Sequence, residues 1–347
     1  MRKPLSDYKG LTRLAPESHL RSLARQEPLN AYSTSNLLAW MKHVGAYWFH
    51  KRCPFPKVVP STISMPDETR IAIAGDWGSG TDEAAAVARQ IVASEPDYTI
   101  HLGDVYYVGN TIEIQENFLG VKTSIYDPVK WPDGKLGSFS LCGNHEMFSN
   151  GAAFYDILLP GLKQPTSFFR LENDNWIILG LDTAYNSTGL DFGPFKPSCA
   201  LPKQIVDWLA ASSFPLNKRV IVLTHHQPWS AFETGYPAAA RQLSAVLHSP
   251  FIWIWGHEHR MAMYEPLTAY GVTASGFCAG HGGMPVTVKK PEADAHCKVN
   301  FTDTRIRDSA GMKVGYNGHL QLQFIGRRLL LSFIDMEGAV IYREECN

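Results

Sequence analysis

Six short apolar segments in the sequence end at polar residues whose side chains can bind metal ions. The segments are RIAIAGD, YTIHLGD, SFSLCGN, WIILGLD, RVIVLTHH and FIWIWGHEH, and their terminal groups are Asp76, Asp104, Asn144, Asp182, His225, His226, His257 and His259. Singly, an aspartate or asparagine there could cap a helix, and a histidine could be hydrogen-bonded in the core. Together, carboxylate, amide and imidazole groups form the ligand set of first-row metal ions rather than of a thiolate site. The sequence therefore predicts a metal site with oxygen and nitrogen ligands.

The segments that carry these groups alternate with stretches of helical pattern at 82–94, 203–211 and 237–248. Short apolar runs separated by helices are typical of an α/β protein with mostly buried strands. Ligands in such proteins collect at the carboxyl ends of the strands, so we expect the six strand ends to share one pocket. Residues 318–345 instead alternate with a period of two, which predicts an antiparallel meander at the edge of a second sheet.

The composition indicates a globular protein, because 45% of its 347 residues are apolar and can form one large core. The formal net charge of −1 gives no overall attraction to nucleic acid, and we expect no nucleic-acid partner. No apolar run approaches the roughly 20 residues that span a bilayer, and no apolar signal segment is visible, so we expect a cytoplasmic protein without a membrane span. Six cysteines without a CxxC pair predict reduced thiols rather than a sulfur-ligated metal.

Residues 1–66 differ from the rest of the chain and predict a helical extension with a linker, which leaves residues 67–347 as the main domain. Apolar residues at spacings of three and four predict one amphipathic helix, formed by Leu37, Leu38, Met41, Val44, Tyr47 and Trp48. The prolines of residues 53–66 cannot continue this helix and predict an extended linker. We expect the helix to pack on the main domain, with a lid, a dimer contact or a membrane-surface role as the alternatives.

Five of the polar clusters resemble a known set of motifs. GDWG (75–78), GDVYY (103–107), GNHE (143–146), VLTH (222–225) and GHEH (256–259) are similar, in this order, to the signature of the calcineurin-like metallophosphoesterases. Within that superfamily the chain most resembles the purple acid phosphatases, the small tartrate-resistant type in particular, over residues 70–345. The resemblance implies a four-layer α/β/β/α sandwich in which two mixed sheets are flanked by helices, and a catalytic domain at residues 67–347.

The resemblance also implies two metal sites that share one carboxylate. The implied ligands are Asp76, Asp104, Tyr107 and His259 for the first ion, and Asp104, Asn144, His225 and His257 for the second. Many metallophosphoesterases have a histidine two residues after the first aspartate, but this sequence has Gly78 there. Tyr107 is implied to replace that histidine, and the alternative is that Tyr107 is a buried aromatic residue beside Tyr106. Asp182 is expected to be structural, since the ligand set is complete without it.

The implied tyrosine ligand restricts the metal in the first site. A free phenol has a pKa of about 10, so binding as phenolate at neutral or acid pH needs a strongly polarising ion. We therefore expect Fe(III) in the first site. Two imidazoles, an amide oxygen and the shared carboxylate suit Fe(II), Zn(II) and Mn(II) about equally, so the identity of the second metal stays open.

The expected reaction is hydrolysis of a phosphomonoester by in-line attack of a metal-bound hydroxide, as in an acid phosphatase. The charges favour it, because three anionic ligands oppose about five positive charges on the two ions and leave a cationic centre. The resemblance implies that Asn144 and His145 contact the phosphate and that His145 helps the leaving group to depart. The expected substrate is a small phosphate ester or a phosphoprotein.

The sequence departs from the family pattern at a second acid. Small family members have a Glu-His pair after the fourth motif, whereas this chain has Glu233 followed by Thr234. A threonine cannot act as a general acid, so His226, Glu233 or His281 takes the role, or the substrates have good leaving groups. His226 could equally be a hydrogen-bonded neighbour of the ligands. His281, in a glycine-rich loop after the last motif, is also predicted to face the substrate.

Two alternative functions stay open at the level of sequence. A phosphodiesterase or nuclease could use the same scaffold, because the metal site alone does not fix how many ester arms are accepted. Diester-cleaving relatives usually keep the histidine that Gly78 replaces, which disfavours this reading. A non-catalytic binding protein that retained the fold is the other alternative, and the complete ligand set disfavours it.

Overall fold

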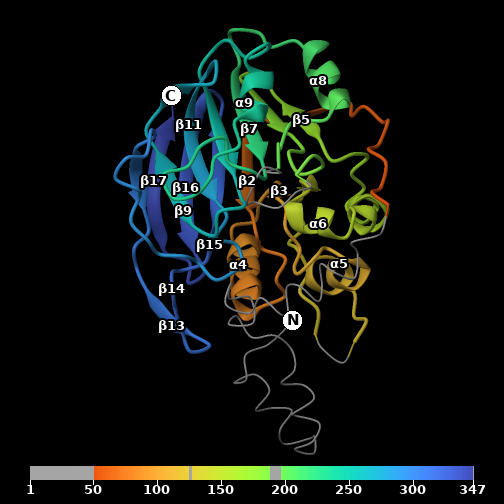
Figure 1. Cartoon of the computed structure of the whole chain (residues 1–347), viewed down its shortest axis with the longest axis vertical. Helices are drawn as coiled ribbons and strands as arrows, with labels where there is room; N and C mark the ends of the chain where they lie inside the picture. Colours follow the sequence, from red (N-terminus) through yellow and green to blue (C-terminus); the bar gives the residue numbers. More distant parts are fainter. Residues whose placement is uncertain (1–50, 125–126, 188–196, 347) are drawn as a thin grey trace, which may run out of the picture.

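The computed structural model describes residues 51–124, 127–187 and 197–346. The amphipathic helix predicted from residues 37–48 lies outside these ranges. Within them, two large β-sheets stack on each other and helices cover their outer faces (Figure 1). The predicted α/β fold class is therefore confirmed.

The two sheets are both mixed. The order of the six-stranded sheet is β17 (Val340–Cys346), β16 (Arg328–Asp335), β15 (Gly318–Ile325), β2 (Glu68–Ala74), β3 (Tyr98–His101) and β4 (Gly137–Ser140). The order of the nine-stranded sheet is β1 (Thr62–Ser64), β5 (Phe169–Glu172), β6 (Trp176–Gly180), β7 (Arg219–Thr224), β8 (Phe251–Trp255), β11 (Val272–Ala279), β9 (Met261–Tyr264) and β12 (Val299–Thr302), with β10 (Leu267–Ala269) paired to β11. A separate hairpin consists of β13 (Arg307–Ser309) and β14 (Met312–Val314).

The helices of the described residues are short. They are α4 (Asp82–Ala93), α5 (Thr111–Asn117), α6 (Asn144–Phe148), the π-helix η2 (Phe154–Leu158), α7 (Leu159–Gly161), α8 (Lys203–Ala210) and α9 (Ala238–Leu243). All three predicted helices are present, although α9 ends at Leu243 rather than near residue 248. Helix α5 was not predicted, even though Asn110 and Glu113 form a capping box at its start.

Each of the six predicted strands is present, as β2, β3, β4, β6, β7 and β8. The strands β2, β3 and β4 pair in parallel, and so do β6, β7 and β8. The predicted C-terminal meander is also confirmed, since β15, β16 and β17 pair antiparallel. The prediction that it lies in a second sheet is wrong, because β15 pairs antiparallel with β2 and the meander thus continues the sheet of the first motif.

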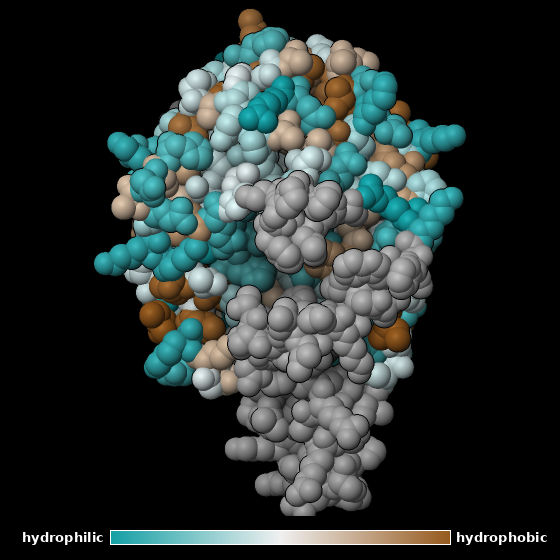
Figure 2. Space-filling view, in the orientation of Figure 1, coloured by the Kyte–Doolittle hydropathy of each residue, from teal (hydrophilic) through white to brown (hydrophobic). Residues whose placement is uncertain are grey.

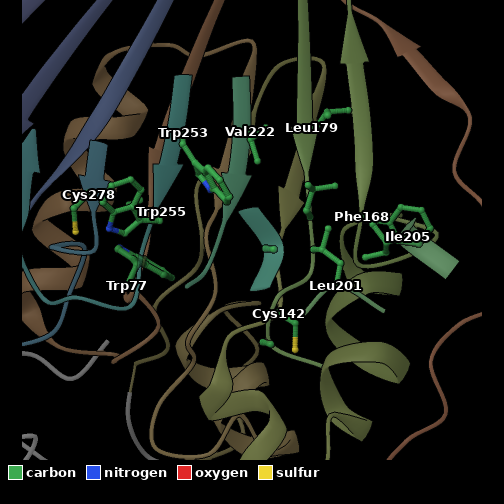
Figure 3. Close-up of a cluster of buried hydrophobic side chains, with 14 of the residues drawn as sticks. Trp77, Cys142, Phe168, Leu179, Leu201, Ile205, Val222, Trp253, Trp255 and Cys278 are labelled. Carbon is green, nitrogen blue, oxygen red and sulfur yellow. The ribbon is translucent and has the colours of Figure 1, made fainter. Parts of the chain in front are cut away.

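The strands are apolar on both faces because each face meets a different core. In β2, Ile71 and Ile73 point into the cluster between the two sheets, whereas Ala72 and Ala74 belong to the outer cluster that includes Val87 of α4. The same alternation holds in the other sheet, where Trp253 and Trp255 lie in the outer cluster and Ile252 and Ile254 in the inner one. Figure 3 shows part of this outer cluster, with Leu179, Val222 and Trp253 on the neighbouring strands β6, β7 and β8. Two buried faces explain the continuous apolar runs in the sequence.

The predicted linker packs on the main domain. Residues 51–61 form neither helix nor strand, and β1 pairs in parallel with β5. The Phe55 side chain is only 8% exposed, and its ring centroid lies 4.9 Å from that of Tyr185 and 6.2 Å from that of Phe168. The backbone N–H of Cys53 donates to the carbonyl of Asn150. This part of the linker is therefore anchored by aromatic packing as well as by strand pairing.

The surface of the described residues is mainly polar. On the face shown in Figure 2, hydrophilic residues predominate and apolar residues form small separate groups. The helices in this part of the chain are all too short and too polar to cross a bilayer. The six cysteines all lie in the described ranges and are free thiols, four of them buried.

The aromatic anchor of the linker can be tested by substitution. We expect Phe55→Ala to lower the free energy of unfolding by about 3 kcal/mol, because it leaves a cavity among buried aromatic rings. The matched control is Val58→Ala, since Val58 is 52% exposed and should change stability little. Urea unfolding of both variants measures the difference. Equal unfolding midpoints for the two variants would show that Phe55 does not anchor the segment.

Candidate metal centre

The carboxyl ends of strands from both sheets meet at one place. The residues after β2, β3 and β4 supply Asp76, Asp104 and Asn144, and those after β7 and β8 supply His225, His257 and His259. The two groups are in contact, because the backbone N–H of His257 donates to Asp76 Oδ2 at 2.7 Å and His225 Nε2 lies 2.9 Å from Asn144 Oδ1. The polar side chains of five of the six predicted strand ends therefore lie together.

Glycine residues allow these loops to approach each other. A Cβ atom on Gly143 would lie 2.1 Å from Asp104 Oδ1, and one on Gly103 would lie 2.9 Å from His225 Nδ1. Gly103 also has a φ of +103°, a conformation that favours glycine. Any larger side chain at either position would push the polar groups apart.

Three of the predicted ligands have unusual backbone conformations. Asp76, Asp104 and His257 have φ values of 57°, 76° and 66°. Non-glycine residues in this left-handed region cost about 1–3 kcal/mol each and concentrate at functional sites. The backbone strain of the strand ends is therefore located at the residues that the sequence motifs single out.

The first group of donor atoms includes a tyrosine hydroxyl, and it belongs to Tyr106. The Tyr106 Oη atom lies 2.8 Å from Asp76 Oδ1, 2.9 Å from Asp104 Oδ2 and 3.0 Å from His259 Nε2. Burial, followed by the charges of Asp104 and Asp76, raises the pKa of Tyr106 well above its ordinary value. The hydroxyl therefore donates its proton to the two carboxylates in hydrogen bonds. We call Asp76, Asp104, Tyr106 and His259 the first donor set.

Tyr107, the residue that the resemblance implies as a ligand, takes a different position. Its backbone N–H donates to Glu113 Oε1 at 2.7 Å, and its carbonyl oxygen lies 2.5 Å from His145 Nδ1. Its side chain is 2% exposed and belongs, like that of Tyr106, to a small buried cluster with Val108 and Met284. The structure brings Tyr106, and not the implied Tyr107, to Asp76 and His259. The consecutive tyrosines in GDVYY were the only signal for this in the sequence.

The second donor set consists of Asp104, Asn144, His225 and His257. His225 Nε2 lies 3.3 Å from Asp104 Oδ1 and 2.9 Å from Asn144 Oδ1, and the ring centroids of His225 and His257 are 5.1 Å apart. Asp104 therefore presents Oδ1 to this set and Oδ2 to the first set. Potential ligand atoms of Asp76, Asp104 and His225 all lie within 4.8 Å of one another, and so do those of His225, His226 and His257.

The histidines of the second set have the protonation that metal binding requires. His225 Nδ1 lies 2.9 Å from the carbonyl oxygen of Leu102, which fixes the proton on Nδ1 and leaves the Nε2 lone pair free. Burial and then the neighbouring His225 lower the pKa of His257 to about 4, so this imidazole is neutral at neutral pH. Burial alone would raise the pKa of Asp104, but His145, His225 and His257 together lower it, so it is a carboxylate.

His145 lies beside Asp104, the residue that the two donor sets share. Its backbone N–H donates to Asp104 Oδ1 at 3.0 Å, and its Nε2 atom is 3.7 Å from Asp104 Oδ2. Its Nδ1 atom faces the carbonyl of Tyr107, which turns Nε2 toward the donor sets. The side chain is 12% exposed, so the imidazole remains in contact with solvent.

His226 is buried beside the second set. Its Nδ1 atom lies 3.0 Å from Thr183 Oγ1, which also accepts the backbone N–H of His226. Its ring centroid is 4.7 Å from that of His257 and 5.2 Å from that of Tyr236. Burial and then His257 lower the pKa of His226 well below its ordinary value, so it is neutral.

The other residues considered for acid or substrate roles lie farther from the donor sets. Glu233 Oε1 accepts a hydrogen bond of 2.7 Å from Arg260, and this cation lowers the pKa of Glu233 despite its burial. His281 packs its ring against Phe333 and its Nε2 against Gly318, at the start of β15. The contacts of the Glu233 carboxyl and the His281 ring are thus with Arg260 and with Phe333 and Gly318, and the charges of His257 and His259 also act on Glu233.

Asp182 is structural, as predicted. It accepts hydrogen bonds from the Tyr155 hydroxyl at 2.8 Å and from the backbone N–H groups of Ala184 and Tyr185 at 2.9 Å. These bonds hold the turn after β6, and this is the one strand end of the six that contributes to neither donor set.

Two buried glutamates that the sequence reasoning missed hold the loop of the second motif. Glu146 accepts backbone N–H groups of Asp104, Val105 and Gly143, at 2.9 to 3.2 Å. Glu113 accepts those of Tyr107, Val108 and Asn110, at 2.7 to 3.1 Å. The loop that carries Asp104 and Tyr106 is therefore held at both ends by the carboxyl groups of Glu146 and Glu113. The Glu in GNHE was the available signal for Glu146.

Comparison with solved structures shows the same fold in distant proteins. A purple acid phosphatase from yellow lupin (Lupinus luteus) seeds superposes with a TM-score of 0.52 at 15% identity, over 84% of this chain and 55% of that enzyme. The chain therefore spans about half the length of the lupin enzyme. GAP50, the anchor in the inner membrane complex of Plasmodium, superposes with a TM-score of 0.54 at 15% identity, over 81% of this chain and 89% of that protein. No curated protein sequence matches the chain.

The family model for the calcineurin-like phosphoesterases matches residues 69–261, which is more than half of the chain. This range includes all five motifs and both donor sets. The chain therefore belongs to the calcineurin-like phosphoesterase family.

Proposed function

We propose that the chain is a two-metal phosphatase that hydrolyses phosphomonoesters, of the purple acid phosphatase type. The observation that supports this most is the position of Asp104, whose two oxygens face two separate donor sets. A carboxylate placed in this way can serve two cations at a separation of about 3.5–4 Å. The phenol hydroxyl in the first set distinguishes it from a site built only of histidines and carboxylates.

The donor atoms are spaced as expected for ligands of a metal ion. Ligand atoms at right angles on one ion, with bonds of about 2.1 Å, lie about 3 Å from each other. In the second set, His225 Nε2 lies 2.9 Å from Asn144 Oδ1 and 3.3 Å from Asp104 Oδ1. The donors are therefore spaced as ligands of one ion and need little rearrangement to bind it.

The donor types favour different ions in the two sets. A phenol oxygen with two carboxylates suits Fe(III), whereas two imidazoles, an amide oxygen and the shared carboxylate suit Fe(II), Zn(II) or Mn(II). Such a cation pair would supply positive charge for the phosphate and acidify a water molecule. The proposed substrate is accordingly a phosphate ester.

We infer that His145 is the group that assists the leaving group. Burial lowers the pKa of His145, but the Tyr107 carbonyl fixes its Nδ1 proton, so Nε2 is the atom that can hold and release a second proton beside Asp104. Glu233 is less suited to this role, because its ion pair with Arg260 favours the ionised carboxylate. His226 is fixed by Thr183 and remains neutral, which suits a group that orients the second donor set.

The proposed reaction is tested by metal analysis together with a panel of phosphomonoesters and phosphodiesters from acid to neutral pH. We expect metal-dependent hydrolysis of monoesters and a visible colour from Fe(III) bound to a phenolate. Faster cleavage of diesters would instead identify a phosphodiesterase. Tight binding of two metals without turnover would identify a binding protein, a role consistent with the fold shared with the GAP50 anchor.

Removing the amide ligand should affect one site only. We expect Asn144→Ala to lower the metal content from about two ions per chain toward one after dialysis, because Asn144 belongs only to the second set. Asn186→Ala is the control, since the Asn186 side chain donates to the carbonyl of Ala200 instead. Elemental analysis measures the content. An Asn144→Ala variant that keeps both ions would contradict the assignment of the second set.

An experiment can distinguish proton donation to the leaving group by His145 from a role in positioning the phosphate. We expect His145→Ala to lower kcat by about 10²-fold for esters with basic leaving groups, and less for activated aryl esters. The difference arises because a good leaving group departs without protonation. Steady-state kinetics over a series of leaving groups measures how the loss in kcat depends on the basicity of the leaving group. An equal loss for every leaving group would instead indicate that His145 only positions the phosphate.

A further inference from the structure

The structure assigns the phenol ligand of the first donor set to Tyr106, and we propose this in place of Tyr107. The inference rests on the proposed two-metal centre and identifies one of its ligands. The family pattern places the tyrosine ligand three residues after Asp104, at Tyr107. The hydroxyl that contacts the other donors belongs to Tyr106, two residues after Asp104. The change matters because the phenol is the group that would select the metal.

The spacing of the donor atoms supports Tyr106 as a ligand. Its Oη atom lies 2.8, 2.9 and 3.0 Å from Asp76 Oδ1, Asp104 Oδ2 and His259 Nε2. These values match the separation of about 3 Å between neighbouring ligand atoms on one ion with bonds of about 2.1 Å. Asp76 Oδ1 and His259 Nε2 are themselves 3.5 Å apart. The four atoms are therefore spaced as part of one coordination shell.

The backbone of the loop determines which tyrosine faces the other donors. The N–H of Tyr106 donates to the carbonyl of Gly78 at 3.0 Å, and its carbonyl accepts from Asn117 Nδ2 at 3.1 Å. The N–H of Tyr107 donates to Glu113, and its carbonyl faces His145 Nδ1. Placing Tyr107 in the first set would require these buried hydrogen bonds to break. Each buried polar group left without a partner would cost about 1–3 kcal/mol.

The missing histidine of the first motif has a steric explanation in the same loop. A Cβ atom on Gly78 would lie 2.8 Å from the Cα atom of Val105, so a side chain at position 78 has no room. Gly78 and Val105 instead form a parallel bridge between the first and second motif loops. This bridge places the residue after Val105 beside Asp76. Tyr106 thus fills the space next to the first aspartate.

The experiment compares Tyr106→Phe with Tyr107→Phe, which remove the same oxygen atom from neighbouring residues. Wild type and both variants are loaded with iron and examined by visible absorption. Each is also stripped with a chelator and titrated with Zn²⁺ to count the bound equivalents. Thermal unfolding of the three proteins checks that the variants are folded.

We expect Tyr107→Phe to keep the visible band and about two equivalents of Zn²⁺, as in the wild type, and Tyr106→Phe to lose the band and fall to about one equivalent. Loss of the band or of one equivalent in Tyr107→Phe would overturn the proposal. Two equivalents in both variants would do the same, because neither hydroxyl would then be needed.

The remaining outcomes separate this inference from the proposed function. If the wild type is colourless with iron, the expectation of Fe(III) fails, but the Zn²⁺ count still decides between the two tyrosines. If the wild type binds no cation, the two-metal centre itself is wrong and the ligand assignment falls with it. If Tyr106→Phe does not fold, the Tyr107→Phe variant alone gives the answer, since its band and its count must both be retained.

Discussion

The position of the Asp104 carboxylate is the constraint on which the rest of the site depends. Its Oδ2 atom accepts a hydrogen bond from the Tyr106 hydroxyl and its Oδ1 atom lies near His225, so a single side chain joins two donor sets. Burying this charge is unfavourable unless polar groups surround it, and the backbone N–H of His145 and the Tyr106 hydroxyl do so. The left-handed backbone of Asp104 and the absence of a side chain at Gly143 follow from the same requirement, because both allow the carboxylate to lie where the strand ends of the two sheets meet.

The stacked sheets provide the rigid support for this arrangement. Strands with two buried faces hold their ends in place, and the loops beyond them are fixed by Glu113 and Glu146 through bonds to backbone N–H groups. A carboxyl group that accepts several backbone N–H groups gives partners to donors that the loop would otherwise bury unpaired. The residues that bind and the residues that hold the binding loops therefore come from the same short motifs, as His145 and Glu146 show.

Much of this could be predicted from the sequence, for physical reasons. Apolar runs that end at Asp, Asn or His marked six strands and their carboxyl ends, since a doubly buried strand has a clear pattern. The choice between Tyr106 and Tyr107 could not be predicted, because it depends on contacts of Tyr106 with Gly78 and of Tyr107 with His145, which join distant parts of the chain. His281 was misplaced for a similar reason, since a glycine-rich loop does not reveal which way an imidazole turns.

The division of the donors between the sheets has a mechanical consequence. Asp76, Asp104 and Asn144 follow strands of one sheet, and His225, His257 and His259 follow strands of the other. An ion held by both groups would crosslink the two sheets, and its binding free energy would add to the stability of the folded state. At a free concentration 100 times its dissociation constant, such an ion stabilises the folded state by about 2.7 kcal/mol. The midpoint temperature of thermal unfolding would then report how fully the metal sites are occupied.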